Sequence, residues 1–151
     1  MYPGNAHEQH LLERAAAGDR VAFTAPTVME ISRGLASAAS ASSALAAALA
    51  WFTQLAGSGA VRVLSLDAAA AVIAGRLRAA QPIPPTGARR SGSRAEQRAG
   101  WVLDLQIAAC VYSHGYGLAT DNQRDMTEAR NLIRVLYPDA APLDVQPPPS
   151  L

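Results

Sequence analysis

Lysine is absent from this chain of 151 residues, and all 13 basic residues are arginine. There is a single cysteine, Cys110, so an internal disulfide is excluded and a cytoplasmic protein is favoured. The sequence contains no run of ~18 consecutive apolar residues, the length that a membrane-spanning helix needs, so no membrane partner is expected. The formal net charge of +1 gives the chain no overall preference for acidic or basic partners.

Half of the residues are apolar, which is enough for one sizeable core, and the length predicts one compact domain. The periodicity of the apolar residues predicts short strands that alternate with helices. The expected strands cover residues 21–25, 61–66 and 117–120. The expected helices cover residues 6–17, 44–55, 68–80, 101–114 and 127–136, and a further helix begins at Pro26. This alternation indicates an α/β fold, with a short parallel sheet flanked by helices.

Residues 81–100 form the one long stretch without periodicity. Its arginines are Arg89, Arg90, Arg94 and Arg98. We predict a mobile basic loop here, leading into the helix that begins at Trp101. Because arginine forms paired hydrogen bonds with phosphate oxygens, these arginines are candidates for contacts with a nucleic acid. The alternative interpretation is a solvated loop without a binding role.

Four acids lie near the expected junctions between strands and helices: Glu30, Asp104, Asp121 and Asp125. Glu30 follows the first strand, Asp104 is expected in the first turn of its helix, and the other two follow the last strand. Since strand ends and the following helix starts share one edge of a parallel sheet, these acids are expected to converge. Converging carboxylates suit Mg²⁺, which also relieves their mutual repulsion.

Each acid also has a purely structural interpretation. Asp104 would favour a helix N-terminus through the helix dipole, Glu30 would be a surface acid, and Asp121 and Asp125 would cap the last helix or shape a turn. The shared position at strand–helix junctions favours a metal site. A metal there would polarise a phosphate oxygen and deliver an attacking hydroxide, so phosphodiester hydrolysis is the predicted reaction.

Three segments of the chain resemble the PIN-domain ribonucleases, and among them the VapC-like toxins of bacterial toxin–antitoxin pairs. Residues 30–35 resemble the glutamate-bearing helix of that family, and residues 104–109 resemble its central aspartate helix. Residues 117–126 resemble its last strand and acidic turn. The similarity covers roughly residues 6–136 and implies a PIN-like three-layer α/β fold.

The resemblance implies a magnesium- or manganese-dependent endoribonuclease toxin that cleaves RNA. It also implies a homodimer and a cognate antitoxin that inserts a side chain into the acidic pocket. By resemblance, Glu30 and Asp104 are catalytic acids that hold the metal, and Asp121 or Asp125 completes the cluster. Thr120 would hydrogen-bond a ligand or a water molecule. The basic loop would contact the RNA.

The implied PIN-like domain covers residues 1–137, and residues 138–151 form a proline-rich tail that is expected to trail along the surface. Two departures from the family pattern bear on activity. The family's sheet begins with a strand that ends in a metal-binding aspartate, whereas residues 1–6 of this chain resemble the turn that follows this strand. We therefore expect this first strand and its aspartate to be missing. In addition, Asn122 stands where many relatives carry an acid, and asparagine is a weaker, neutral ligand.

Three interpretations stay open at this point. The first is an active metal-dependent endoribonuclease toxin. The second is a catalytically impaired PIN remnant that acts only by binding a partner protein. The third is an unrelated α/β protein in which the acids serve as helix caps.

Overall fold

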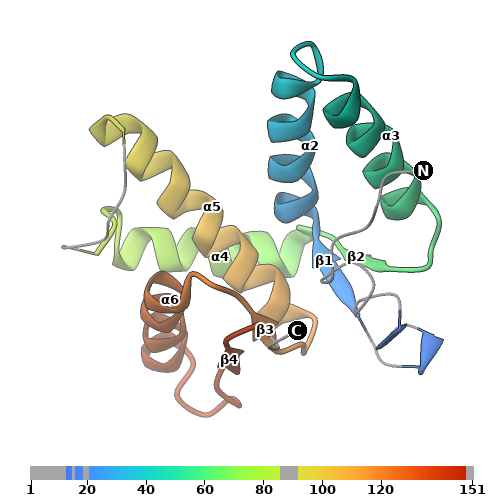
Figure 1. Cartoon of the computed structure of the whole chain (residues 1–151). Helices are drawn as coiled ribbons and strands as arrows, with labels where there is room; N and C mark the ends of the chain where they lie inside the picture. The colour runs from blue at the N-terminus through green and yellow to red at the C-terminus, as the bar shows by residue number, and fades with distance from the viewer. Residues whose placement is uncertain (1–12, 15, 19–20, 86–91, 149–151) are drawn as a thin grey trace. The chain divides into compact units, whose positions relative to one another are not determined.

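The computed structural model describes residues 13–14, 16–18, 21–85 and 92–148, which form a mixed α/β structure that is mostly helical. The chain divides between Leu64 and Ser65 into two compact units, and each unit is described by itself. Unit 1 contains β1 (Ala22–Thr24), α2 (Ala25–Ala39), α3 (Ser43–Gly57) and β2 (Arg62–Leu64) (Figure 1). Unit 2 contains α4 (Ala68–Ala80), α5 (Arg94–Ser113), β3 (Leu118–Ala119), α6 (Gln123–Leu136) and β4 (Val145–Gln146).

Unit 1 is a short parallel strand pair joined to a helical hairpin. Phe23 of β1 lies opposite Val63 of β2, and α2 packs beside α3. Thr24 begins α2 as its N-cap, because its side chain accepts a hydrogen bond from the backbone N–H of Thr27. Pro26 lies in the first turn, as the sequence predicted, where its missing N–H has no intrahelical acceptor to lose. The ring of Phe23 meets the ring of buried Phe52 edge to face, with centroids 6.1 Å apart.

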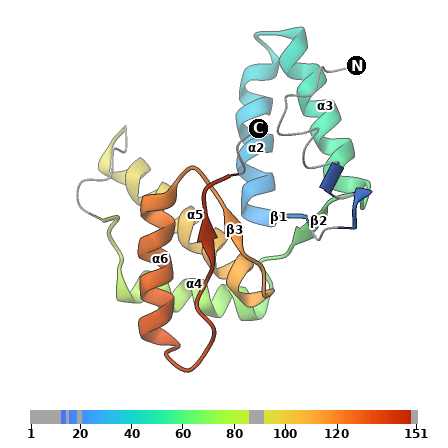
Figure 2. The ribbon, with the colours of Figure 1, turned by 60° about the horizontal axis from the view of Figure 1, so that its bottom comes forward.

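The core of unit 2 lies between α4, α5 and α6. Its largest fully buried side chains include Leu77, Trp101, Leu105 and Ile133. Trp101 is 0% exposed, and its indole Nε1–H donates a hydrogen bond to the carbonyl oxygen of Gln81, at 2.8 Å. This bond ties the chain that leaves α4 to the side of α5. Figure 2 shows α6 beside β4, which completes the unit.

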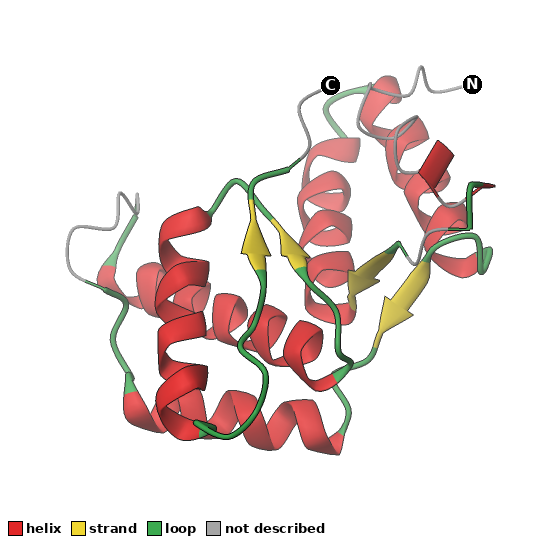
Figure 3. Cartoon of the chain, turned by 90° about the horizontal axis from the view of Figure 1, so that it is seen from below, coloured by secondary structure: helices red, strands yellow, loops and turns green. Residues whose placement is uncertain are grey.

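The described strands form two separate parallel pairs, β1–β2 and β3–β4, rather than the single short sheet that the sequence predicted (Figure 3). The parallel pairing itself is confirmed. β4 lies in the segment that was expected to trail along the surface. Most of its described residues are exposed, as expected, but the segment is also paired and anchored. The N–H of Thr120 donates to the carbonyl of Gln146, and Leu143 is only 2% exposed. Long-range pairing and burial therefore hold this proline-rich segment in place.

Two helices of unit 2 begin earlier than the sequence analysis predicted. α5 begins at Arg94 rather than Trp101, because Ser93 and Glu96 form a capping box. Asp104 therefore lies in the middle of its helix and not in the first turn. α6 begins at Gln123 rather than at residue 127. Most of the expected helix 6–17 lies outside the described residues.

Asp67 caps α4, as the sequence predicted: its Oδ1 accepts a hydrogen bond from the N–H of Ala70, at 2.9 Å. Replacing Asp67 by alanine is expected to lower the free energy of unfolding by about 1 kcal/mol, because a helix N–H loses its acceptor. Asp67→Ser should retain most of the stability, since serine caps as well. Urea denaturation followed by far-UV circular dichroism measures both. An equal loss in both variants would instead assign the effect to the contact of Asp67 with His114, at 3.5 Å.

Candidate functional site

The end of β3 meets the middle of α5 at a polar contact. The side-chain Nδ2 of Asn122 donates to Oδ1 of Asp104, at 3.5 Å, although the two residues are 18 positions apart. Asp104 is half-buried and Asn122 is exposed. The structure therefore brings together one of the predicted metal-site acids and one of the predicted supporting residues.

The turn between β3 and α6 is held by Thr120. Its hydroxyl oxygen accepts the backbone N–H of Asn122, at 3.1 Å, and its carbonyl accepts the side-chain amide of Gln123. Asn122 is the N-cap of α6 but makes no side-chain capping bond, and its amide donates to Asp104 instead. Thr120 thus fixes the turn, and the turn directs Asn122 towards Asp104.

Asp121 in this turn and Asp125 in the helix that follows it differ in their exposure to solvent. Asp121 is exposed, whereas Asp125 lies in the first turn of α6 and is only 5% exposed. A carboxylate in the first turn is stabilised by the positive end of the helix dipole. Across the described part of the chain, no group of three or more His, Cys, Asp or Glu side chains is arranged to hold a metal ion. Asp104, Asp121 and Asp125 therefore do not form a closed carboxylate cluster.

Glu30 lies on α2 in unit 1, whereas the other three acids belong to unit 2. It forms an ion pair with Arg33, in which Nη2 of the arginine donates to Oε2 of the glutamate at 2.8 Å. The hydrogen bonds from Arg33 lower the pKa of Glu30, outweighing the smaller opposite effect of desolvation. The carboxylate therefore stays charged, and a metal ion at Glu30 would compete with the guanidinium of Arg33.

Asp104 and the turn after β3 carry oxygen donors of the kind that magnesium binds. The carboxylate of Asp104 and the hydroxyl of Thr120 are hard oxygen donors, and the exposed carboxylate of Asp121 follows directly along the chain. Magnesium usually binds proteins through one or two carboxylates and completes its six ligands with waters and substrate phosphates. A cluster of three protein acids is therefore not needed.

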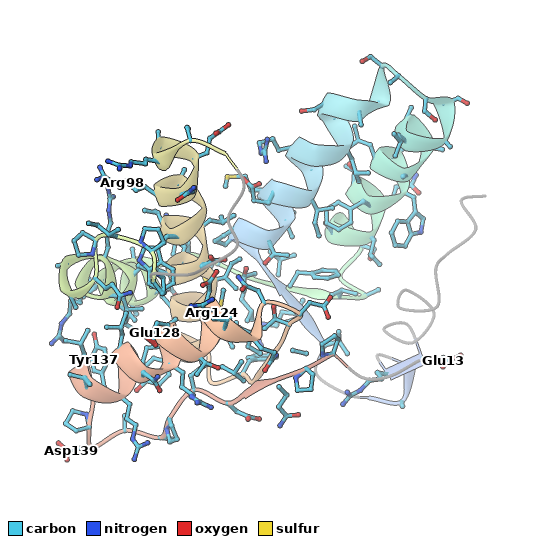
Figure 4. All side chains as sticks on the ribbon, turned by 60° about the vertical axis from the view of Figure 1, so that its left-hand side comes forward. Glu13, Arg98, Arg124, Glu128, Tyr137 and Asp139 are labelled. Atoms are coloured by element: carbon cyan, nitrogen blue, oxygen red, sulfur yellow. The ribbon has the colours of Figure 1, made fainter. Side chains whose placement is uncertain are left out.

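The structure describes two of the four arginines that were predicted to contact a nucleic acid. Arg94 and Arg98 are exposed in the first turns of α5, not in a loop as predicted. Figure 4 labels Arg98 on this helix. The missed capping box is the reason, because it starts the helix seven residues earlier than Trp101. Arg89 and Arg90 lie outside the described residues.

Sequence reasoning missed one cavity in unit 2. It has a volume of about 570 Å³, and its lining residues are Gln81, Ile83, Pro84, Pro85, Arg124 and Glu128. The prolines that follow α4 were interpreted only as part of an irregular loop. The sequence signal for this cavity was the pair Pro84 and Pro85, which stiffens the backbone after α4, together with the charged residues Arg124 and Glu128 near the start of α6.

Cys110 behaves as the buried small residue that the sequence predicted. It is 0% exposed, and its Sγ lies 3.6 Å from the carbonyl oxygen of Ser65. Burial, assisted by the negative charge of Asp67, raises the pKa of the Cys110 thiol to about 11. The thiol therefore stays protonated at neutral pH and is a poor nucleophile.

Comparison of the chain with protein-family models, curated proteins and solved structures finds no match. Among the helices that the structure describes, none is long and apolar enough to cross a membrane.

Proposed function

We propose that this chain is a metal-dependent endoribonuclease of the PIN-like, VapC-like type, with magnesium or manganese as its cofactor. The observation that carries the proposal is the contact between Asp104 and Asn122 at the end of β3. It places an acid from a central helix beside a polar turn that follows a strand, which is where an α/β fold gathers ligand-binding groups.

In this proposal, Asp104 is the principal carboxylate that holds the metal ion, and Asp121 and Thr120 offer further oxygen atoms. Asn122 holds Asp104 in place through its amide N–H. When bound, the ion would polarise a phosphate oxygen and lower the pKa of a water molecule. The exposed Arg94 and Arg98 would bind RNA phosphates, with Arg89 and Arg90 as further candidates. Binding is then expected to weaken as salt rises.

Asp125 and Glu30 have less direct roles in this proposal. Asp125 is buried in the first turn of α6, so it would act on the site through its negative charge rather than through exposed oxygens. Glu30 would join the site only by exchanging its ion pair with Arg33 for the metal. A cognate antitoxin and a homodimer partner belong to the same proposal.

The second candidate function is a PIN remnant that only binds a partner protein. One observation favours it, the ion pair with Arg33 that engages Glu30. The two candidates differ in one measurable property, since only the nuclease needs a metal ion.

Calorimetric titration of the purified chain with Mn²⁺, and separately with Mg²⁺, tests the proposal. We expect one specific binding event, lost in Asp104→Asn, because the substitution removes a charged ligand while keeping the side-chain shape. Asp139→Asn is the matched control, since it removes an exposed carboxylate that follows the far end of α6. If the folded protein binds neither ion, or if Asp104→Asn binds as tightly as the unchanged chain, the metal site is wrong and the partner-binding remnant is favoured.

A further inference from the structure

One cavity among the described residues of unit 2 has two kinds of wall. One wall is the segment that follows α4, which presents Ile83, Pro84 and Pro85. Ile83 is 57% exposed, which is unusual for a large apolar side chain and leaves an apolar surface in contact with solvent. The other wall is the start of α6, which presents Arg124 and Glu128 one helical turn apart, as Figure 4 shows. The volume of about 570 Å³ falls within the usual range for small-molecule sites.

The walls are held by contacts inside unit 2. The carbonyl of Gln81, at the start of the apolar wall, accepts the indole N–H of fully buried Trp101. Two prolines restrict the backbone of the same wall. At the other wall, Glu128 is half-buried, and its Oε2 accepts a hydrogen bond from Nδ2 of Asn131, at 3.4 Å. Hydrogen bonds within unit 2 and the restricted proline backbone therefore hold parts of both walls in place.

The combination of an apolar wall with one cation and one anion selects a particular ligand chemistry. A flat aromatic group stacks on the proline rings and the isoleucine side chain. An arginine only donates hydrogen bonds and a carboxylate only accepts them, so a ligand with acceptors on one edge and donors on the next matches both residues. Guanine has this pattern, with acceptors at O6 and N7 and donors at N1–H and N2–H₂.

We propose that this cavity binds an unpaired guanine base of a single-stranded RNA segment. The base would stack on Pro84 and Pro85, with Arg124 on its O6/N7 edge and Glu128 on its N1–H and N2–H₂ donors. Adenine, cytosine and uracil lack two adjacent donors for the carboxylate, so they fit less well. Sequence-specific RNA recognition commonly reads unpaired bases in this way, by stacking and by hydrogen bonds to base edges.

The cavity adjoins the candidate metal site along the chain, since Arg124 is two residues beyond Asn122. A base held there would place the RNA backbone beside the turn that holds Asp104. The guanine proposal thus rests on the proposed nuclease function and deepens it, because it names the base that the substrate presents next to the cleavage site.

Binding of GMP, AMP, CMP and UMP, measured separately by calorimetry without a divalent metal, tests the guanine site. We expect GMP to bind about tenfold or more tightly than the other three, which share its phosphate and ribose. Glu128→Gln should abolish this preference, because it replaces one of the two acceptor oxygens by an NH₂ donor that faces a donor of the base, and it removes the charge. Arg124→Gln should weaken GMP binding to a similar degree. Arg134→Gln, which removes an exposed arginine from the last turn of α6, should leave binding unchanged.

Thermal unfolding of each variant shows whether it is folded, and only folded variants are compared. Equal affinity for the four nucleotides, or a guanine preference that survives Glu128→Gln, would overturn the guanine site. Because no metal ion is present, the result is independent of the metal titration above. A guanine preference without Mn²⁺ binding would support the cavity and reject the nuclease, and Mn²⁺ binding without a guanine preference would do the reverse.

Discussion

Replacing Trp101 by alanine is expected to lower the free energy of unfolding by about 3–5 kcal/mol. The indole is 0% exposed in the core of unit 2, so its removal leaves a large cavity between helices that are already closely packed. The substitution also removes the donor that pairs with the carbonyl of Gln81, at 2.8 Å. A typical small domain is stable by only about 5–15 kcal/mol, so the loss would bring unit 2 close to unfolding.

Urea denaturation followed by far-UV circular dichroism measures this effect, and two further variants separate its causes. Trp101→Phe retains an aromatic side chain and loses the hydrogen bond, so it should cost less than the alanine variant. Val135→Ala is the surface control, because Val135 is 77% exposed, and it should change stability by less than about 0.5 kcal/mol. A Trp101→Ala variant as stable as Val135→Ala would contradict the core described for unit 2.

The elements that were predicted correctly are those whose sequence signals lie within the element or next to its ends. The helix expected at residues 68–80 is found at Ala68–Ala80, because Asp67 provides a cap and the alanines favour a helix. The start of α5 was missed although Ser93 and Glu96 form a capping box, because the first two turns carry polar and small residues without an apolar periodicity. β4 was missed for a different reason. Its two residues form a strand only by pairing with β3, which no local pattern reports.

The position of Asp104 was predicted for a reason that the structure does not support. The sequence argument put Asp104 in the first turn of a helix at the edge of one sheet, whereas it lies in the middle of α5. Its Oδ1 nevertheless lies 3.5 Å from the amide of Asn122, in the turn after β3. The role of Asn122 could not be read from the sequence, since an asparagine at a helix start ordinarily caps that helix. The burial of Asp125 and the cavity beside Arg124 depend on how α6 packs, which is a property of the tertiary structure.

For the proposed nuclease, Asp104→Asn is expected to reduce manganese-dependent cleavage of RNA by at least about 100-fold. Loss of a supporting residue around a metal site already costs about 10–100-fold, and Asp104 is proposed to hold the ion directly. Asn122→Ala removes only the amide that donates to Asp104, so its activity should fall by about 10–100-fold. Cleavage of a fluorescently labelled RNA under single-turnover conditions measures both variants.

Measurements on two variants of Asn122 separate a role in positioning Asp104 from a role in stability alone. If Asn122 orients Asp104, Asn122→Ala should also weaken Mn²⁺ binding in calorimetry, while its urea midpoint stays close to that of the unchanged chain. Asn122→Asp should disfavour the present contact, because two carboxylates repel at 3.5 Å, and added Mn²⁺ should relieve that repulsion. A fall in activity that follows only a fall in stability would contradict the positioning role. Cleavage that persists in folded Asp104→Asn would show that the acid at the centre of the proposed site does not hold the metal.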